Sequence, residues 1–351
     1  MKQCSNDGFI VLIEICGKPL IISFILITFF FKIQEMKAYI SLIAFSVLTI
    51  FACKKEDDKD GPIPSNETQI EYPSYEQEID VQINGLSFDA MEPFISPDGS
   101  TLFFNNLNNG INTKIYYASK VNDSTFNFVG ELNGANQITP PHLDGVPDLD
   151  SQGNFYWTST RDYPNRLDNL FYGKYSNGMV RDSGRLQGDF NLNIPGWLVM
   201  DHGISFNGQY LYFNNARFDN LNCQGLCETR LGIAQKVNDS TFNTISNSEE
   251  LLKNVTDTNY VFYAPYISSD DLELYYTRFP AGGVSPQTQV EILVAVRNDP
   301  NAPFSKPKVL FADNIGNIVE APCLTANKQI MYYHKKVGGV HEIKMRYREQ
   351  I

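Results

Sequence analysis

The sequence predicts an all-β protein, a five-bladed β-propeller made of four-stranded antiparallel blades. A turn-and-strand segment recurs five times along the chain. The 351 residues include 19 Tyr, 24 Phe, 24 Gly and 18 Pro, a composition that favours strands joined by frequent turns. No helix-period segment follows the N-terminal 52 residues. Together these three observations predict a ring of similar small sheets.

The five copies align without gaps over fifteen residues. The fifth position carries an oxygen side chain that can close a turn, a turn pair such as Asp-Gly follows, and the twelfth position is always aromatic. Each copy therefore predicts a strand, a tight turn and an aromatic-rich strand. The copies begin at Glu92 (EPFISPDGSTLFFNN), Val146 (VPDLDSQGNFYWTST), Asp201 (DHGISFNGQYLYFNN), Ala264 (APYISSDDLELYYTR) and Ala321 (APCLTANKQIMYYHK).

Two further strands are expected in each blade. A third strand follows each copy, and fourth strands are predicted at residues 128–134, 185–191, 249–255 and 308–314. The octamer KVNDSTFN occurs identically at 120–127 and 236–243. We expect it to form the same hairpin, between the third and fourth strands, in blades one and three.

The ends of the chain are expected to close the ring. The fifth copy ends at Ile351 without a fourth strand, whereas an unassigned strand, EIDVQING, occupies Glu78–Gly85. We predict that this N-terminal strand pairs in the last blade and covers its open edge.

The SPDG turn of the first copy, followed by an apolar-aromatic strand, resembles the WD40-like repeat of TolB-type propellers. The resemblance covers about residues 78–351, although the fourth and fifth copies replace the motif by SSDD and TANK. In that family the turn is structural, so the resemblance implies a fold without implying a substrate.

The N-terminal region has the pattern of an export signal. Residues 36–52 combine a basic start with an apolar core, and IFAC resembles a lipobox that implies acylation of Cys53 in a bacterial lipoprotein. Residues 53–77 are expected to form a disordered tether, with the propeller at 78–351. We interpret residues 1–35 as an extension upstream of a true start at Met36. The expected location is the outer membrane, on its periplasmic or cell-surface side, with the lipid anchor in the membrane.

Charge and cysteine content exclude several classes. The net charge is −12 without a basic block, which argues against a nucleic-acid partner. Cys223 and Cys227 are candidates for a local disulfide in an oxidising compartment, and Cys323 lies in a strand pattern as a small buried apolar residue. No metal or cofactor is expected: residues 148–154 lack the terminal glutamate of a calcium loop, and His142 with His202 is too small a ligand set.

Polar and aromatic side chains gather where each innermost strand begins and where the second strand ends. In a propeller both places lie at the same mouth of the central channel, so they predict a binding site for a glycan, a peptide or a partner protein. The alternative is that these charges pair with one another between blades. The candidates are Glu92, Asp144, Asp148, Trp197, Asp201, His202, Tyr263 and Glu320 in an inner set and Arg161, Arg217, Arg278 and Lys335 in an outer set.

Catalysis is the second hypothesis. Two of Glu92, Asp201 and Glu320 would suit a glycoside hydrolase if their separation matched a retaining or inverting mechanism. No glycosidase signature and no Gly-x-Ser-x-Gly elbow accompany them. We therefore expect binding rather than catalysis.

Overall fold

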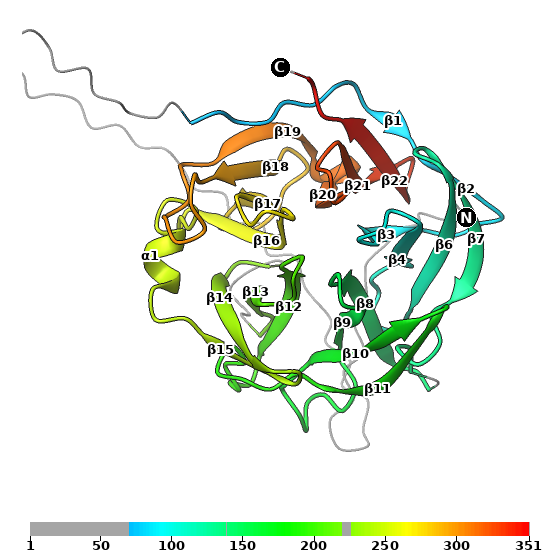
Figure 1. The fold of residues 1–351 in the computed structure, drawn as a ribbon, viewed down its shortest axis with the longest axis horizontal. Helices are drawn as coiled ribbons and strands as arrows, with labels where there is room; N and C mark the ends of the chain where they lie inside the picture. The colour runs from blue at the N-terminus through cyan, green and yellow to red at the C-terminus, as the bar shows by residue number, and fades with distance from the viewer. Residues whose placement is uncertain (1–69, 138, 220–225, 351) are drawn as a thin grey trace, which may run out of the picture. The chain divides into compact units, whose positions relative to one another are not determined.

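The computed structural model describes residues 70–137, 139–219 and 226–350. Within these residues the chain forms five sheets arranged in a ring (Figure 1). The predicted five-bladed, all-β propeller is confirmed.

Each blade is an antiparallel meander of four strands, with the first strand innermost. From the axis outwards, blade 1 contains β3 (Met91–Ile95), β4 (Thr101–Asn105), β6 (Ile115–Asn122) and β7 (Thr125–Glu131); blade 2 contains β8 (His142–Leu149), β9 (Asn154–Ser159), β10 (Leu170–Ser176) and β11 (Met179–Arg185); blade 3 contains β12 (Trp197–Ile204), β13 (Tyr210–Arg217), β14 (Thr229–Asn238) and β15 (Thr241–Thr244); blade 4 contains β16 (Tyr260–Ile267), β17 (Glu273–Pro280), β18 (Gln289–Val296) and β19 (Lys308–Asn314); and blade 5 contains β20 (Val319–Leu324), β21 (Ile330–Val337), β22 (Val340–Tyr347) and β1 (Ile79–Asp80). The short β5 (Asn112–Thr113) joins the inner edge of blade 2 by pairing parallel with β8.

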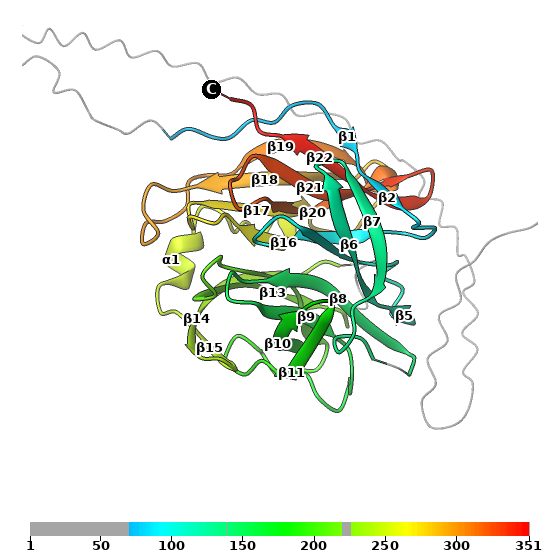
Figure 2. The same ribbon diagram turned by 45° about the vertical axis from the view of Figure 1, so that its right-hand side comes forward.

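The N-terminal strand closes the ring as predicted. β1 pairs antiparallel with β22, with Ile79 opposite Met345. The chain then continues into β2 (Gln82–Asn84), which pairs parallel with β7 of blade 1 (Figure 2). One extended segment therefore covers the outer edges of both the last and the first blade, which protects two strand edges instead of one.

The chain contacts the propeller upstream of the expected boundary at residue 78. Tyr75 forms an isolated antiparallel bridge with Arg348, and its hydroxyl lies 2.8 Å from that of Tyr275. The Tyr72 hydroxyl donates to the carbonyl oxygen of Lys306 at 2.6 Å. Residues 72–77 thus belong to the folded unit. The remaining expectations for residues 1–69, including the signal peptide and Cys53, lie outside the described residues.

The repeated turn has the same chemistry in every blade. In four blades the hydroxyl at the fifth repeat position accepts the backbone N–H five residues later, as in Ser205 from Tyr210 at 2.8 Å. Asp150 takes this role in blade 2 by accepting the N–H groups of Gln152 and Asn154. The eighth position has a positive φ in all five copies: Gly99 (72°), Gly153 (79°), Gly208 (71°), Asp271 (60°) and Lys328 (60°). The two copies that lack the glycine therefore keep the turn, which explains why the repeat survives the loss of its motif.

The aromatic column forms part of the core. Its side chains are at most 1 % exposed: Phe103, Trp157, Tyr212, Tyr275 and Tyr332. Several contact the adjoining blade, as where the ring of Tyr332 lies edge-on to Phe126 of blade 1 at 6.0 Å. Because blades repeat in angle, one aromatic position per repeat fills each wedge between blades.

The echoed octamer behaves as expected. Residues 120–127 span the turn between β6 and β7, and residues 236–243 span the turn between β14 and β15. Lys120 and Lys236 each pair with the aspartate three residues later, at 2.8 and 2.9 Å.

Two expected fourth strands are wrong. Residues 249–255 do not form a strand, because the outer strand of blade 3 is the shorter β15, and α1 (Ser248–Leu252) follows it. Leu251, Leu252 and Val255 are all buried, and this spacing fits one face of a helix better than the alternation of a strand. In blade 2 the outer strand ends at Arg185, where the expected strand would begin.

A 3-10 turn, η1 (Ile315–Asn317), precedes β20. Within the described ranges, the helical segments are too short and too polar to cross a membrane.

Candidate functional site

The innermost strands all bend near the axis. The pairing register shifts at this point in every blade, between residues such as Met91 and Phe94 in blade 1. Four of the bends place a residue before proline at positive φ: Glu92 (52°), Val146 (55°), Ala264 (48°) and Ala321 (56°). Such bulges release a backbone N–H from the ladder. This freed donor is what connects each blade to its neighbour.

A ring of polar contacts joins the blades around the axis. The N–H groups of Val146 and Ala321 donate to Asn105 Oδ1 (3.0 Å) and Thr277 Oγ1 (3.1 Å) of the preceding blades. The N–H of Glu92 donates to His334 Nδ1 at 3.0 Å, across the junction of blades 1 and 5. Buried polar groups without partners are costly, so these contacts help fix the angle between blades.

One acceptor in this ring is Asp201, which accepts the Ala264 N–H at 3.2 Å; the other acceptors come from one repeat position, the fourteenth. It holds Asn105, Ser159, Asn214, Thr277 and His334, which are all fully buried or nearly so. None of these residues is in the predicted site, although the sequence carries a signal: the position is polar in every copy and lies two residues after the aromatic column.

Three carboxylates, from blades 1, 3 and 5, face the same axial region, and blades 1 and 5 are neighbours in the ring. Burial first, then the charges of Asp201 and Glu320, raise the pKa of Glu92 well above its ordinary value. Burial and the charge of Glu320 raise the pKa of Asp201 to about 7, although the Ala264 N–H at 3.2 Å opposes this. All three are among the site residues predicted from the sequence, and the charge of each carboxylate opposes ionisation of its neighbours.

Glu320 is the carboxylate most strongly held. Burial opposes its ionisation, yet His334 and the Tyr263 hydroxyl keep the pKa of Glu320 below its ordinary value. The hydroxyl donates to Oε2 at 2.5 Å, and His334 Nε2 lies 2.8 Å from Oε1. Because His334 Nδ1 accepts the Glu92 N–H, a ring proton sits on Nε2, which donates to Glu320.

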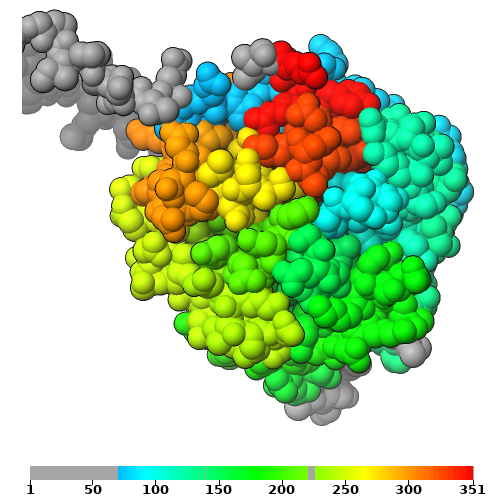
Figure 3. All heavy atoms as spheres, in the orientation of Figure 1, coloured from blue at the N-terminus to red at the C-terminus, as the bar shows by residue number. Residues whose placement is uncertain are grey.

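The axial cavity is small. Its volume is about 40 Å³, and Glu92, Asp148, Asp201 and His202 are among its lining residues. The space-filling view shows the blades meeting closely around the centre (Figure 3). The channel therefore admits a small group and not an extended chain.

Two side chains in this cavity have unused hydrogen-bonding atoms. Within the described part of the chain, neither ring nitrogen of His202 and not Glu92 Oε2 has a partner. His202 is 4 % exposed, and burial lowers its pKa to about 3, so the imidazole is neutral. Asp148, whose pKa burial raises to about 8, already accepts the N–H groups of Leu149 and Ile204.

The outer basic set is paired, but mostly within single blades and not between blades as the alternative interpretation expected. Arg161 donates to the fully buried Asp144 at 2.7 Å and stacks on Phe171 at 4.4 Å. The other ion pairs of this set are Arg217 with Asp219 (2.7 Å) and Glu228 (3.4 Å), Arg278 with Glu291 (2.7 Å), and Lys335 with Glu78 and Asp313 (both 3.3 Å). These bases serve blade structure and do not form a free basic ring.

The remaining predicted site residues separate from the axis. Trp197 is 6 % exposed, beneath the guanidinium of Arg230 at 4.5 Å. The structure therefore brings together Glu92, Asp148, Asp201 and His202 around the cavity, with Glu320 and Tyr263 joined to them by charge and hydrogen bonds.

The predicted metal and cysteine features concern Asp150, Cys227 and Cys323. Among the described residues there is no group of three or more His, Cys, Asp or Glu side chains arranged to hold a metal ion. Asp150 of the calcium-like loop serves the repeat turn. Cys323 is 2 % exposed in β20, whereas the candidate partner of Cys227, Cys223, lies outside the described residues, so the disulfide stays a prediction.

No protein-family model matches the chain, and no curated protein matches it. Solved structures with a similar arrangement include the endo-arabinase from Bacteroides thetaiotaomicron VPI-5482 (15 % identity, 78 % of this chain and 97 % of that chain, TM-score 0.48). The putative TolB from Agrobacterium tumefaciens (14 %, 77 % and 78 %, 0.43) and the α-L-arabinofuranosidase from Lactobacillus brevis (14 %, 76 % and 92 %, 0.43) are also similar. The expected likeness to TolB-type propellers is a likeness of fold. One fold hosts many activities, so at these identities it carries no substrate or reaction to this chain.

Proposed function

We infer that this propeller is a binding protein of the cell envelope, and that its axial cavity receives a cationic group of a peptide or partner protein. The observation that carries this proposal is the cluster of Glu92, Asp201 and Glu320. In the described residues none of the three forms an ion pair with a lysine or arginine. Every basic residue predicted for the mouth forms an ion pair with another acidic residue, so no lysine or arginine of the described chain neutralises the negative charge of this cluster.

Electrostatics favours a cation at this place. Carboxylates that raise one another's pKa repel when ionised, and an ammonium or guanidinium between them would remove that repulsion. The net charge of −12 would also attract a basic partner from a distance. Binding should therefore release protons from Glu92 and Asp201.

Size favours a single charged group over a sugar. The cavity of about 40 Å³ is comparable with the ~30 Å³ that one water molecule occupies in the liquid. A pyranose ring needs several times that volume. Of the ligands expected from the sequence, a peptide or protein side chain fits the axis better than a glycan.

The envelope setting rests on the N-terminal sequence. We propose export through the signal at residues 36–52 and acylation of Cys53, with the protein held at the outer membrane on its periplasmic or cell-surface side. Mass spectrometry of the exported protein tests this: an acylated N-terminal Cys53 is expected, and retention of the segment before it would contradict the proposal.

Hydrolysis of a glycan is the second candidate, favoured by one observation. The neighbours of Glu92 and Glu320 move their pKa values in opposite directions, as an acid and a base at one site require. The narrow cavity opposes it. Release of reducing sugar from a polysaccharide, lost in Glu320→Gln, would favour the enzyme.

Calorimetric titration with a trilysine peptide tests the binding proposal. We expect binding that strengthens between pH 6 and pH 8, since the pKa of Asp201 is about 7, and a loss of about tenfold in Asp201→Asn. A fully acetylated trilysine should not bind. Glu249→Gln, which removes an exposed carboxylate on α1, is the matched control. Equal affinity in Asp201→Asn and Glu249→Gln would place any binding outside the axial cavity.

A further inference from the structure

A second hollow lies between blades 3 and 4, away from the axial cavity. Its volume is about 440 Å³, within the usual range of small-molecule sites. Its walls come from the start of β13, the end of β14, the segment from Asn243 to Asn247, and the turn after β18. Second strands start and third strands end at the face opposite the mouth. This hollow is therefore on the other side of the ring.

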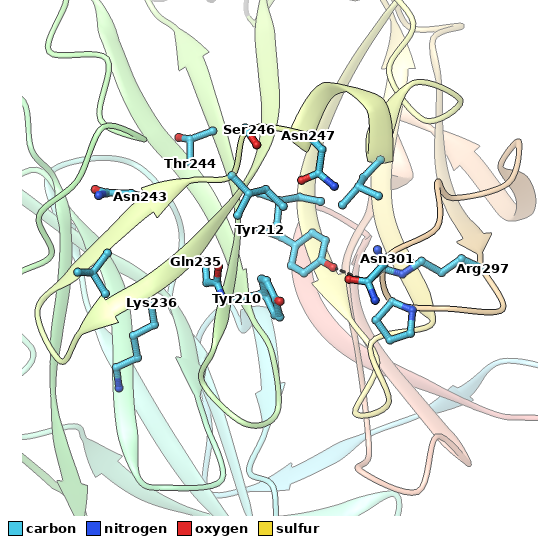
Figure 4. A pocket seen from close by; sticks show the side chains of 15 residues that line it. Tyr210, Tyr212, Gln235, Lys236, Asn243, Thr244, Ser246, Asn247, Arg297 and Asn301 are labelled. Atoms are coloured by element: carbon cyan, nitrogen blue, oxygen red, sulfur yellow. Dashed lines mark hydrogen bonds between the residues drawn. The ribbon is translucent and has the colours of Figure 1, made fainter.

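The hollow exists because blade 3 departs from the repeat. Its outer strand β15 has 4 residues, whereas β7, β11 and β19 have 7 each. After β15 the chain turns outwards through Ile245–Asn247 into α1, so the outer strand stops short. The space that a full fourth strand would fill is left open between the blades (Figure 4).

The lining is rich in unused amides. Among the described residues, the side chains of Gln235, Asn243 and Asn247 have no hydrogen-bond partner, nor has the hydroxyl of Tyr210. An amide offers both donors and acceptors, and a tyrosine ring offers a flat apolar face beside its hydroxyl. Figure 4 shows these groups lying around one space, with Arg297 and Asn301 on the far side.

The far wall is fixed in place. Arg297 is 6 % exposed, donates from Nη2 to the Tyr212 hydroxyl at 3.0 Å and from Nε to the carbonyl oxygen of Asp271 at 2.8 Å. Its guanidinium also lies 4.1 Å from the centre of the Phe304 ring. Arg297 is therefore held in place opposite the amides of Gln235, Asn243 and Asn247, which have no hydrogen-bond partner in the described part of the chain. A wall that is already ordered lowers the entropic cost of binding a ligand.

We propose that this hollow, here called the blade 3–4 cleft, binds a disaccharide-sized sugar. The hydroxyl groups of a sugar would pair with Gln235, Asn243 and Asn247, and its ring would lie against Tyr210. The volume suits two sugar rings, and the wall is amide-rich without a cluster of like charges, which favours an uncharged polyhydroxylated ligand. This site is independent of the cation proposed for the axial cavity.

Titration calorimetry of the full chain with three probes tests the proposal: cellobiose, xylobiose and N,N′-diacetylchitobiose. We expect at least one to bind with a Kd of about 1 mM or tighter. Gln235→Ala and Asn247→Ala should each weaken that binding about tenfold, and Asn247→Trp, which fills the cleft, should abolish it. Gln289→Ala is the matched control, because Gln289 is likewise an exposed glutamine on a third strand but lies outside the cleft.

The outcomes separate cleanly. Unchanged melting temperatures in the variants would show that lost binding is not lost folding. If none of the probes binds with a Kd below about 10 mM, or if Gln235→Ala and Gln289→Ala bind alike, the proposal is wrong. Asp201→Asn should leave sugar binding unchanged, so failure of the axial proposal would not affect this result.

Discussion

Two buried carboxyl groups of this propeller, those of Asp144 and Asp201, have different partners. Asp144 is fully buried and directly paired with Arg161, whereas Asp201 is buried with only a backbone N–H at 3.2 Å and other carboxylates near it. In the first arrangement the arginine neutralises the carboxylate, whereas in the second the carboxyl group of Asp201 is costly to ionise. Such uncompensated groups are characteristic of places that bind something.

Asp201→Asn should change how stability depends on pH. The pKa of Asp201 rises from 3.8 to about 7 on folding, so between these values the folded state holds more protons than the unfolded state. Stability must then fall as pH rises through this window. The asparagine variant should match the wild type near pH 4 and exceed it at pH 8, by up to about 4 kcal/mol. Urea unfolding at several pH values measures this.

Asp98→Asn serves as a control of opposite sign. Partial burial raises the pKa of the largely exposed Asp98, but hydrogen bonds from Ser96 and Ser100 lower it by a larger amount, to a net value below the ordinary one. The ionised Asp98 therefore stabilises the folded state at neutral pH, and this stabilisation is lost as the pH falls through the lowered pKa. This variant should be less stable than the wild type at pH 7 and approach it near pH 3. If the stability difference from the wild type changed with pH in the same direction in both variants, the raised pKa assigned to Asp201 would be wrong.

At the scale of elements, one turn repeated five times sets the geometry of every inner hairpin. The side-chain oxygen at the fifth repeat position takes the place of a backbone acceptor, so it holds the hairpin without a further strand. Blade 3 keeps this inner turn, although its outer strand β15 is short and is followed by α1.

Ser205→Ala should destabilise the protein by ~1–3 kcal/mol. The Ser205 hydroxyl, which is fully buried, accepts the N–H groups of Gln209 and Tyr210. Alanine would remove the acceptor of the Tyr210 N–H, whereas the Gln209 N–H would keep Asn207 Oδ1. Ser151→Ala, at an exposed serine in the neighbouring turn, should have little effect. Thermal unfolding of both variants is the measurement, and equal melting temperatures would show that the turn hydroxyl is dispensable.

At the scale of the whole molecule, stability depends on closing the ring. Blade 5 is complete only when β1 pairs with β22, and β2 then continues onto blade 1. Ion pairs strengthen this junction, with Lys344 2.8 Å from Asp80 and Lys335 3.3 Å from Glu78. The chain between these contacts acts as a strap across the seam.

Removing the strap should open the seam. A chain that begins at residue 86 lacks β1, β2 and the Tyr75 contacts, so the outer edges of β22 and β7 would be exposed. We expect its melting temperature to fall by more than ~10 °C and its tendency to aggregate to rise. A chain that begins at residue 66, the start of the compact unit, should melt like the full chain. Scanning calorimetry and light scattering compare them, and similar behaviour of the two truncations would contradict a sealing role.

The sequence by itself determined the features that repeat. Five copies of a turn and an aromatic column fix five blades and the buried aromatic side chains, because such features depend on local periodicity. The sequence also predicted an N-terminal strand in the last blade, where Ile79 and Asp80 pair, but not the pairing of β2 with blade 1. It also grouped Glu92 and Asp201, at the first repeat position, with Glu320, one residue before that position.

Tertiary structure decided what the polar residues do. Whether Arg161 meets a ligand or Asp144, how narrow the axial cavity is, and that α1 opens a cleft between blades 3 and 4 all depend on neighbours distant in sequence. Cavity size arises from side chains of different blades, and the pairing of Arg161 arises from side chains at different strands of one blade. A single sequence does not specify those distances before the strands and blades pack.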